Sequence, residues 1–147
     1  PAVSSLRNQV AQRVGSQVVG LVEKGITASR IINERSLRNA IKMCLAIGGS
    51  TNAVLHMISI GKELDIDIGL DVFDSLSREI PCLVSVVPSG EHFVTDFYQA
   101  GGVPALAAEL SGHLDLSCLT VDGVKLGECI RHLKPGYDEL EPGYVVR

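Results

Sequence analysis

The sequence predicts an α/β protein segment that is rich in helix, of the kind found in a layered α/β/α domain. Two observations predict this class. Apolar residues recur at three- or four-residue steps along most of the chain, which is typical of amphipathic helices. Three short runs, at 82–87, 119–126 and 144–146, are instead rich in Val and Leu and resemble buried strands.

The first half of the chain is expected to be helical. Capping residues precede each apolar pattern, and glycines follow two of them. The helix over 53–64 is apolar on most sides, which predicts an interior position. The expected elements are a helix over 3–24 (capped by Ser4 or Ser5, closed by Gly25), a short turn from Thr27 to Arg30, a helix over 36–47 (closed by Gly48-Gly49) and the helix over 53–64 (capped by Ser50, Thr51 or Asn52).

The second half alternates shorter helices with the strand-like runs. Pro88-Ser89-Gly90 predicts a turn, and Asp122-Gly123 predicts the two-residue turn of a hairpin. Pro104 is expected at the first position of its helix, where its missing N–H is harmless. The expected helices are one capped by Asp71 with Asp74 in a capping box (Phe73, Leu76 and Ile80 inward, Pro81 at its end), one from Thr95 or Asp96 to Gly101-Gly102, the one at Pro104, and one over 127–133.

Composition excludes several functional classes. The chain has 147 residues and a formal charge of −4, which suits one globular domain and gives no support for nucleic-acid binding. Three Phe and three Tyr are too few for an aromatic stacking platform. No apolar run reaches the ~18 residues of a membrane span, and no signal peptide is evident. We therefore predict a cytoplasmic protein without nucleic-acid or membrane partners.

The four cysteines are scattered along the chain, with no C-x-x-C pair and no histidine at zinc-ligand spacing. Cys44 and Cys129 fall inside helical patterns, and Cys82 opens a strand-like run. We interpret these residues and Cys118 as buried, small apolar side chains of a reduced protein rather than as metal ligands or disulfides.

The most informative stretch is Gly48-Gly49-Ser50-Thr51-Asn52, between two expected helices. Two glycines allow close backbone approach, and the polar side chains would lie at a helix N-terminus, whose free N–H groups and positive dipole end attract anions. A carboxylate or phosphate could bind there. The alternative is a tight interhelical turn with ordinary capping, which chemistry alone favours, because the stretch matches no phosphate-loop or dinucleotide fingerprint.

His56 lies one helical turn after Asn52 on the same face. It could act as a general acid or base or donate to a substrate, although a histidine in an apolar helix is more often a core imidazole bonded to a carbonyl. The remaining histidines, His92, His113 and His132, are expected at the surface. The acidic group at 65–74 lacks calcium-loop spacing, so we attribute it to capping and solvation.

Several sequence blocks follow one another over almost the whole chain. They are Ala46-Ile47-Gly48-Gly49-Ser50-Thr51-Asn52-Ala53-Val54-Leu55-His56, Leu70-Asp71-Val72-Phe73-Asp74, Ile80-Pro81, Pro88-Ser89-Gly90, Asp96-Phe97-Tyr98-Gln99-Ala100-Gly101-Gly102-Val103-Pro104-Ala105 and Leu119-Thr120-Val121-Asp122-Gly123. In this order the blocks resemble the dihydroxy-acid dehydratase / phosphogluconate dehydratase family. Asp122 departs from the family pattern, because the family usually has Thr there.

The resemblance implies a hydro-lyase that converts a 2,3-dihydroxy acid or an aldonic (sugar) acid to a 2-keto acid. It also implies an iron–sulfur cluster, Mg²⁺ and a serine base. None of the four cysteines matches a cluster position, so the resemblance places no metal ligand and no catalytic residue in this chain. Residues 1–147 correspond to the later part of the N-terminal dehydratase domain, without its cluster region and without the C-terminal domain. The start at Pro1 and the apolar run that stops at Arg147 agree with a fragment that is inactive alone.

For such an enzyme, the candidate substrate-binding residues lie in the polar turn and at the helix N-terminus that follows it. They are Ser50, Thr51, Asn52 and His56. Pro1-Ala2-Val3 and Phe97-Tyr98 resemble the sugar-acid branch more than the branched-chain amino-acid branch, whereas 53–56 is common to both and departs from the phosphogluconate branch. The expected partners are a small hydroxy acid and further copies of the protein in a homo-oligomer. The alternative function is a structural or assembly module, which would use the apolar helices over 53–64 and 104–110.

Overall fold

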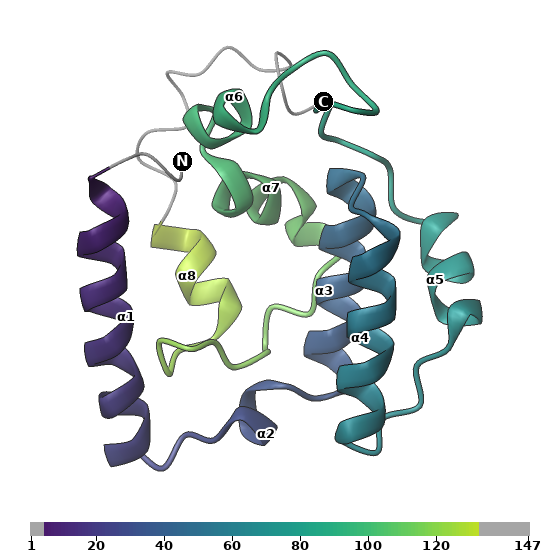
Figure 1. Cartoon of the computed structure of the whole chain (residues 1–147). Helices are drawn as coiled ribbons and strands as arrows, with labels where there is room; N and C mark the ends of the chain where they lie inside the picture. The colour runs from purple at the N-terminus through teal and green to yellow at the C-terminus, as the bar shows by residue number, and fades with distance from the viewer. Residues whose placement is uncertain (1–4, 133–147) are drawn as a thin grey trace.

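The computed structural model describes residues 5–132, and every regular element over that range is a helix (Figure 1). The prediction of a helix-rich segment is therefore confirmed, whereas the predicted strands are absent from the described part of the chain. The elements are α1 (Leu6–Glu23), α2 (Ala28–Ile31), α3 (Glu34–Ile47), α4 (Thr51–Glu63), α5 (Leu70–Ser77), α6 (Val94–Gln99), α7 (Gly102–Glu109), the 3₁₀ turn η1 (Leu110–Gly112) and α8 (Leu126–His132).

α3 is the central helix, and its first turn is fixed by a reciprocal cap. The Asn33 side-chain oxygen accepts from the Ser36 backbone N–H at 3.2 Å, and the Ser36 hydroxyl accepts from the Asn33 N–H at 2.9 Å. The cap explains why α3 begins at Glu34, two residues before the predicted start. Its end is as predicted, because Gly48 adopts the left-handed conformation with φ of 68°.

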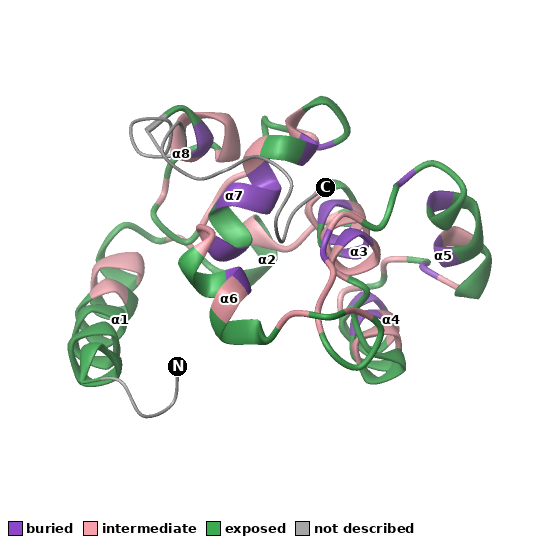
Figure 2. Ribbon diagram, turned by 90° about the horizontal axis from the view of Figure 1, so that it is seen from above, coloured by how far each residue is buried: buried purple, intermediate pink, exposed green. Residues whose placement is uncertain are grey.

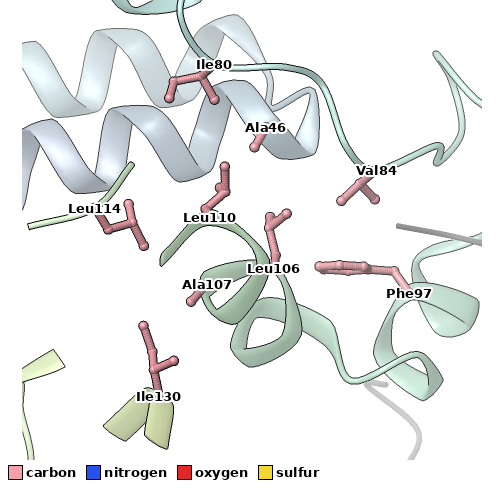
Figure 3. Packing of buried hydrophobic residues seen from close by; sticks show 9 residues of the cluster. All are labelled: Ala46, Ile80, Val84, Phe97, Leu106, Ala107, Leu110, Leu114 and Ile130. Carbon is pink, nitrogen blue, oxygen red and sulfur yellow. The ribbon is translucent and has the colours of Figure 1, made fainter. Parts of the chain in front are cut away.

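Two apolar clusters lie against α3, one on each side. α4 and α5 provide one cluster, while α6, α7, α8 and the chain between α5 and α6 provide the other (Figures 1 and 2). Leu37, Ile41, Met57, Ile68, Phe73 and Leu76 form the first cluster. The second cluster, in which the Phe97 ring extends toward Leu106 (Figure 3), consists of Ala46, Ile80, Val84, Phe97, Leu106, Ala107, Leu110, Leu114 and Ile130. α3 thus holds the two halves of the segment together.

The interior position predicted for the whole helix over 53–64 is wrong. α4 buries Met57 and Gly61, but Leu55 remains 64% exposed and Ile60 40% exposed. The reason is that α4 packs against α3 along one side, and its opposite side faces outward (Figure 2).

The strand predicted over 82–87 is also wrong, although Val84 is buried as expected. The N–H groups of Leu83 and Val84 both donate to the Ala46 carbonyl, at 2.8 and 3.1 Å. The segment therefore docks on the end of α3, and its only ladder-type pairing is the single parallel bridge between Val86 and His92 among described residues. The strand predicted over 144–146 lies outside the described residues.

The hairpin predicted over 119–126 is reduced to its turn. Leu119 and Lys125 form one isolated antiparallel bridge, and Gly123 takes the positive φ of 77° that the turn requires. The second strand cannot extend because α8 begins at Leu126, one residue before the predicted helix start. The predicted turn is confirmed and the predicted pair of strands is not.

Three further helix starts differ from their predicted positions. α5 is capped by Gly69, so Asp71 lies in its first turn, and Asp74 pairs with Arg78 instead of closing a capping box. α6 begins at Val94, because the Asp96 carboxylate accepts from the Phe93 N–H at 2.7 Å. α7 begins at Gly102, which places Pro104 at its third position; this is tolerated because first-turn N–H groups have no intrahelical acceptor.

α1 forms as predicted from residue 6 to residue 23, with Gly25 at φ of 61° after its end. Ser5 is its N-terminal boundary residue but makes no side-chain capping bond. None of the residues of α1 is buried (Figure 2). No helix within residues 5–132 combines the length and the apolar character needed to cross a membrane.

Candidate functional site

The turn between α3 and α4 is tight because two glycines close it. The N–H groups of Gly48 and Gly49 donate to the carbonyls of Leu45 and Cys44, at 3.1 and 2.8 Å. A Cβ on Gly49 would collide with the Cys44 sulfur and would lie 3.0 Å from the Cys44 carbonyl oxygen. Glycine is therefore required at residue 49 by close approach, as the sequence analysis expected of this stretch.

The structure brings a second segment to this turn. A Cβ on Gly48 would lie 3.6 Å from both the Cys82 sulfur and the Ser89 hydroxyl oxygen. The sequence predicted neither neighbour, because its patterns indicate a buried residue at Cys82 and an ordinary turn residue at Ser89. The signal that could have found Ser89 is its Pro88-Ser89-Gly90 block, which is one of the family-like motifs.

Ser50, Thr51 and Asn52 lie together at the start of α4, and all three are exposed. Ser50 is the N-terminal cap residue, yet its side chain makes no capping bond; its carbonyl accepts from the Ala53 N–H at 3.0 Å. The prediction that one of these side chains caps the helix is therefore wrong. Their polar side chains are exposed beside the N–H groups of Thr51 and Asn52, which precede the first hydrogen-bonded N–H of the helix, that of Ala53.

His56 is exposed on α4, one turn beyond Asn52. The interpretation as a core imidazole is wrong, because the core side of α4 is occupied by Met57 and Gly61 instead. The four candidate residues thus share the outer side of the first turns of α4. The geometry offers hydroxyl, amide and imidazole groups next to a positive helix end, which is chemistry suited to a carboxylate.

The cysteines near the turn differ in environment. Burial raises the pKa of the Cys44 thiol, so this group is protonated at neutral pH and serves as packing against Gly49. Cys82 is exposed, which corrects the prediction that it is buried. Cys118 is buried as predicted, and its pKa is raised by burial and by the Asp115 carboxylate.

The described residues provide no metal centre. No group of three or more His, Cys, Asp or Glu side chains within residues 5–132 is arranged to hold a metal ion. Asp65, Asp67, Asp71 and Asp74 are all exposed, and the Asp74 carboxylate accepts from the Arg78 guanidinium at 2.9 Å. Among the other histidines, His113 is exposed as predicted, whereas His92 is half-buried.

A hollow of about 540 Å³ lies elsewhere, between the end of α7 and α8. None of its lining residues belongs to the α3–α4 turn, and its polar lining comes from Ser111, Ser117, Lys125, Glu128 and Arg131. It is therefore separate from the candidate site.

Comparison with known proteins decides the family. Residues 1–129 match the model of the family described as "Dihydroxy-acid/6-phosphogluconate dehydratase N-terminal". The chain belongs to this family. Several relatives are named dihydroxy-acid dehydratase. The relative from Methanothrix thermoacetophila is 47% identical over 91% of this chain and 24% of its own length. The relative from Ignicoccus hospitalis is 43% identical over 89% of this chain and 24% of its own length. The relative from Methanothermobacter thermautotrophicus is 39% identical over 95% of this chain and 26% of its own length.

The dehydratase-family chain spans about a quarter of the length of these curated relatives. The family assignment confirms the resemblance found in the sequence, including the Gly48–Asn52 block, which lies within the matched residues.

Proposed function

We propose that this chain is a segment of a hydro-lyase that dehydrates a 2,3-dihydroxy acid to a 2-keto acid. The observation that carries the proposal is the family match over residues 1–129, together with relatives that are named dihydroxy-acid dehydratase. In such a reaction the C2 proton and the C3 hydroxyl leave as one water molecule. The resulting enol then takes up a proton at C3 and becomes the 2-keto acid.

The role proposed for the α3–α4 turn is to hold the carboxylate end of the substrate. Thr51 and Asn52 provide exposed donors at the α4 N-terminus, and His56 provides an imidazole one turn further on. Ser50 contributes a hydroxyl that the helix does not use as a cap. Such a contact would orient the acid without itself breaking a bond.

The cofactors that the family implies are an iron–sulfur cluster and Mg²⁺. The described residues do not fit either group, because no three His, Cys, Asp or Glu side chains within residues 5–132 are grouped so that they could hold a metal ion. We therefore place the ligands in the part of the parent polypeptide that lies outside this chain. Metals of this kind would act as Lewis acids on the departing hydroxyl and the carboxylate.

An aldonic acid is the second candidate substrate. Phe97-Tyr98 resembles the sugar-acid branch, but Phe97 is 5% exposed and packs in the core. Of this pair, Tyr98 is exposed and would be the residue able to contact a polar ligand. Pro1-Ala2-Val3 lies outside the residues that the structure fully describes.

We further propose that residues 1–147 are the later part of the N-terminal domain, and that this domain has an α/β/α layering completed by strands outside the described residues. A homo-oligomer and a cytoplasmic location remain predictions. The alternative function as an assembly module draws support from the outer side of α4, where Leu55 and Ile60 are exposed. It draws none from α7, whose Ala105, Leu106 and Ala107 are already buried within this chain.

The test is a chimera in which this chain replaces the matching segment of the M. thermoacetophila dehydratase. The assay measures 2-keto acid formed from a branched 2,3-dihydroxy acid and, separately, from an aldonate. Turnover of the dihydroxy acid supports the proposal, and preferential turnover of the aldonate supports the second candidate. A folded chimera that retains the metal content of the M. thermoacetophila enzyme but forms no keto acid from either compound would contradict both.

A further inference from the structure

α1 carries an apolar row that remains largely exposed. Its members recur at every fourth position, so they follow one ridge of the helix. Between 46% and 76% of each residue's surface is exposed, although all are aliphatic. The members of this apolar row are Leu6, Val10, Val14, Val18 and Val22.

The rest of the described chain touches α1 only lightly. The Gln17 amide donates to the Val121 carbonyl at 2.9 Å, and Ile26, just after the helix, approaches Gly123. A Cβ added to Gly15 or Gly20 would meet no atom within 4 Å. In Figure 1, α1 lies at one edge of the molecule, away from the two clusters around α3.

The first half of α1 is positively charged. Arg7 and Arg13 lie in its first half, and its first turn contains no acidic residue. Because the N-terminal end of a helix carries positive partial charge, this half would favour acidic groups on whatever packs against it. The fitting occupant therefore has an aliphatic surface flanked by carboxylates.

The size of α1 argues against a second copy as that occupant. A helix of 18 residues is about 27 Å long and about 10–12 Å wide, so one face offers on the order of 300 Å². Stable dimers bury about 800 Å² on each partner. A single helical face is an ordinary contact within one chain but a small one between two.

We propose that the apolar row of α1 packs against polypeptide of the same dehydratase that lies outside these 147 residues. Relatives that match 91% of this chain have about four times its length, since the match covers 24% of the M. thermoacetophila protein. An amphipathic helix of this length draws most of its stability from packing its apolar side, and the described residues do not supply that packing.

Hydrogen exchange tests the proposal without reference to turnover. We expect the α1 amides of this chain to exchange at least about 100-fold faster than the aligned amides of the full-length M. thermoacetophila enzyme. Equal rates in the two proteins would overturn the proposal. Because exchange reports packing, an inactive protein with protected α1 amides would refute the proposed function and leave this inference intact.

A pair of variants locates the contact within the chimera described above. Val14→Asp places a charge in the apolar row, whereas Ser16→Asp places the same charge two residues on, about 200° around the helix. Val14→Asp should restore fast exchange in α1, and Ser16→Asp should leave it slow. Protection that survives Val14→Asp would contradict the assignment of the row. If the chimera does not fold, the α1 exchange rates of this chain and of the full-length M. thermoacetophila enzyme still test the proposal.

The second copy is tested on the chain alone by light scattering and exchange over a hundredfold range of concentration. A monomer with fast α1 exchange throughout agrees with the proposal. Dimers that form together with slow α1 exchange would replace the proposed occupant with a second copy.

Discussion

Substitution of Gly49 by alanine probes the tightest point of the α3–α4 turn. The added Cβ would collide with the Cys44 sulfur and would stand 3.0 Å from the Cys44 carbonyl oxygen. Overpacking of this kind costs about 1–3 kcal/mol, and the lower entropy of unfolded alanine offsets about 0.4–1 kcal/mol. We therefore expect Gly49→Ala to lower the free energy of unfolding by about 1–2 kcal/mol.

Thermal unfolding followed by circular dichroism measures this loss on the chain itself. At about 4 °C per kcal/mol for a domain of this size, the midpoint should fall by about 4–8 °C. Gly15→Ala is the matched control, because its Cβ would meet nothing within 4 Å and alanine favours the helix. That control should not lower the midpoint.

The partner in the collision is identified by a double-mutant cycle. Cys44→Ala removes the sulfur, so it should be less harmful in the Gly49→Ala background than in the wild type, by about 1 kcal/mol. The remaining contact with the carbonyl oxygen should keep the double variant below Cys44→Ala alone. A Gly49→Ala protein as stable as wild type, or a zero coupling energy, would refute the close approach described at this turn.

Two further predictions concern the loop after η1. The Asn39 side-chain amide donates to the Asp115 carbonyl and accepts from the Asp115 N–H, both at 2.9 Å. Asn39→Ala leaves both backbone groups unpaired, so it should lower the free energy of unfolding in urea by about 1–3 kcal/mol. An unchanged urea midpoint would contradict this prediction. The pKa of Asp115 is lowered, chiefly by the Ser117 hydroxyl and then by the Ser117 N–H. A lowered folded-state pKa stabilises the protein above the unfolded-state pKa, so this contribution should fade as the pH falls through the folded-state value. Ser117→Ala should raise the Asp115 pKa in an NMR titration, and an unmoved pKa would refute the assigned cause.

Helix-forming patterns were readable from the sequence because they are local. The four-residue recurrence predicted α1, and Gly48 and Gly25 end their helices in the left-handed conformation as expected. The first residues of the helices were predicted less accurately. For α3, several neighbouring polar residues could have capped the helix, and the structure shows that Asn33 does so. Exposure of α1 could not be read from periodicity, which shows that a face is apolar but not what covers it.

The strand predictions failed for a non-local reason. The run at 82–87 has strand-like composition, yet its N–H groups at Leu83 and Val84 bond to Ala46. Strand formation needs a neighbouring strand, and the described residues offer only single bridges. Composition therefore identified the buried Val84 but not the kind of element that buries it.

The candidate site was predicted in part. The sequence identified the turn at 48–52, but not that Cys82 and Ser89 lie beside Gly48, since more than thirty residues separate them along the chain. The outward position of His56 also depends on which side of α4 meets α3. These are consequences of packing, and no local pattern contains them.

The turnover of site variants tests the central claim most directly. In the active chimera, Thr51→Val and His56→Leu should each lower kcat/KM for the dihydroxy acid by about tenfold or more, equivalent to about 1.4 kcal/mol, with the iron content unchanged. Ser59→Ala is the control: Ser59 is exposed on the same helix and bonds the Leu55 carbonyl at 2.9 Å, so its loss should leave turnover unaltered. The assignment of the α4 N-terminus as the substrate contact would be contradicted if Thr51→Val and His56→Leu had the same kcat/KM as Ser59→Ala and the parent chimera.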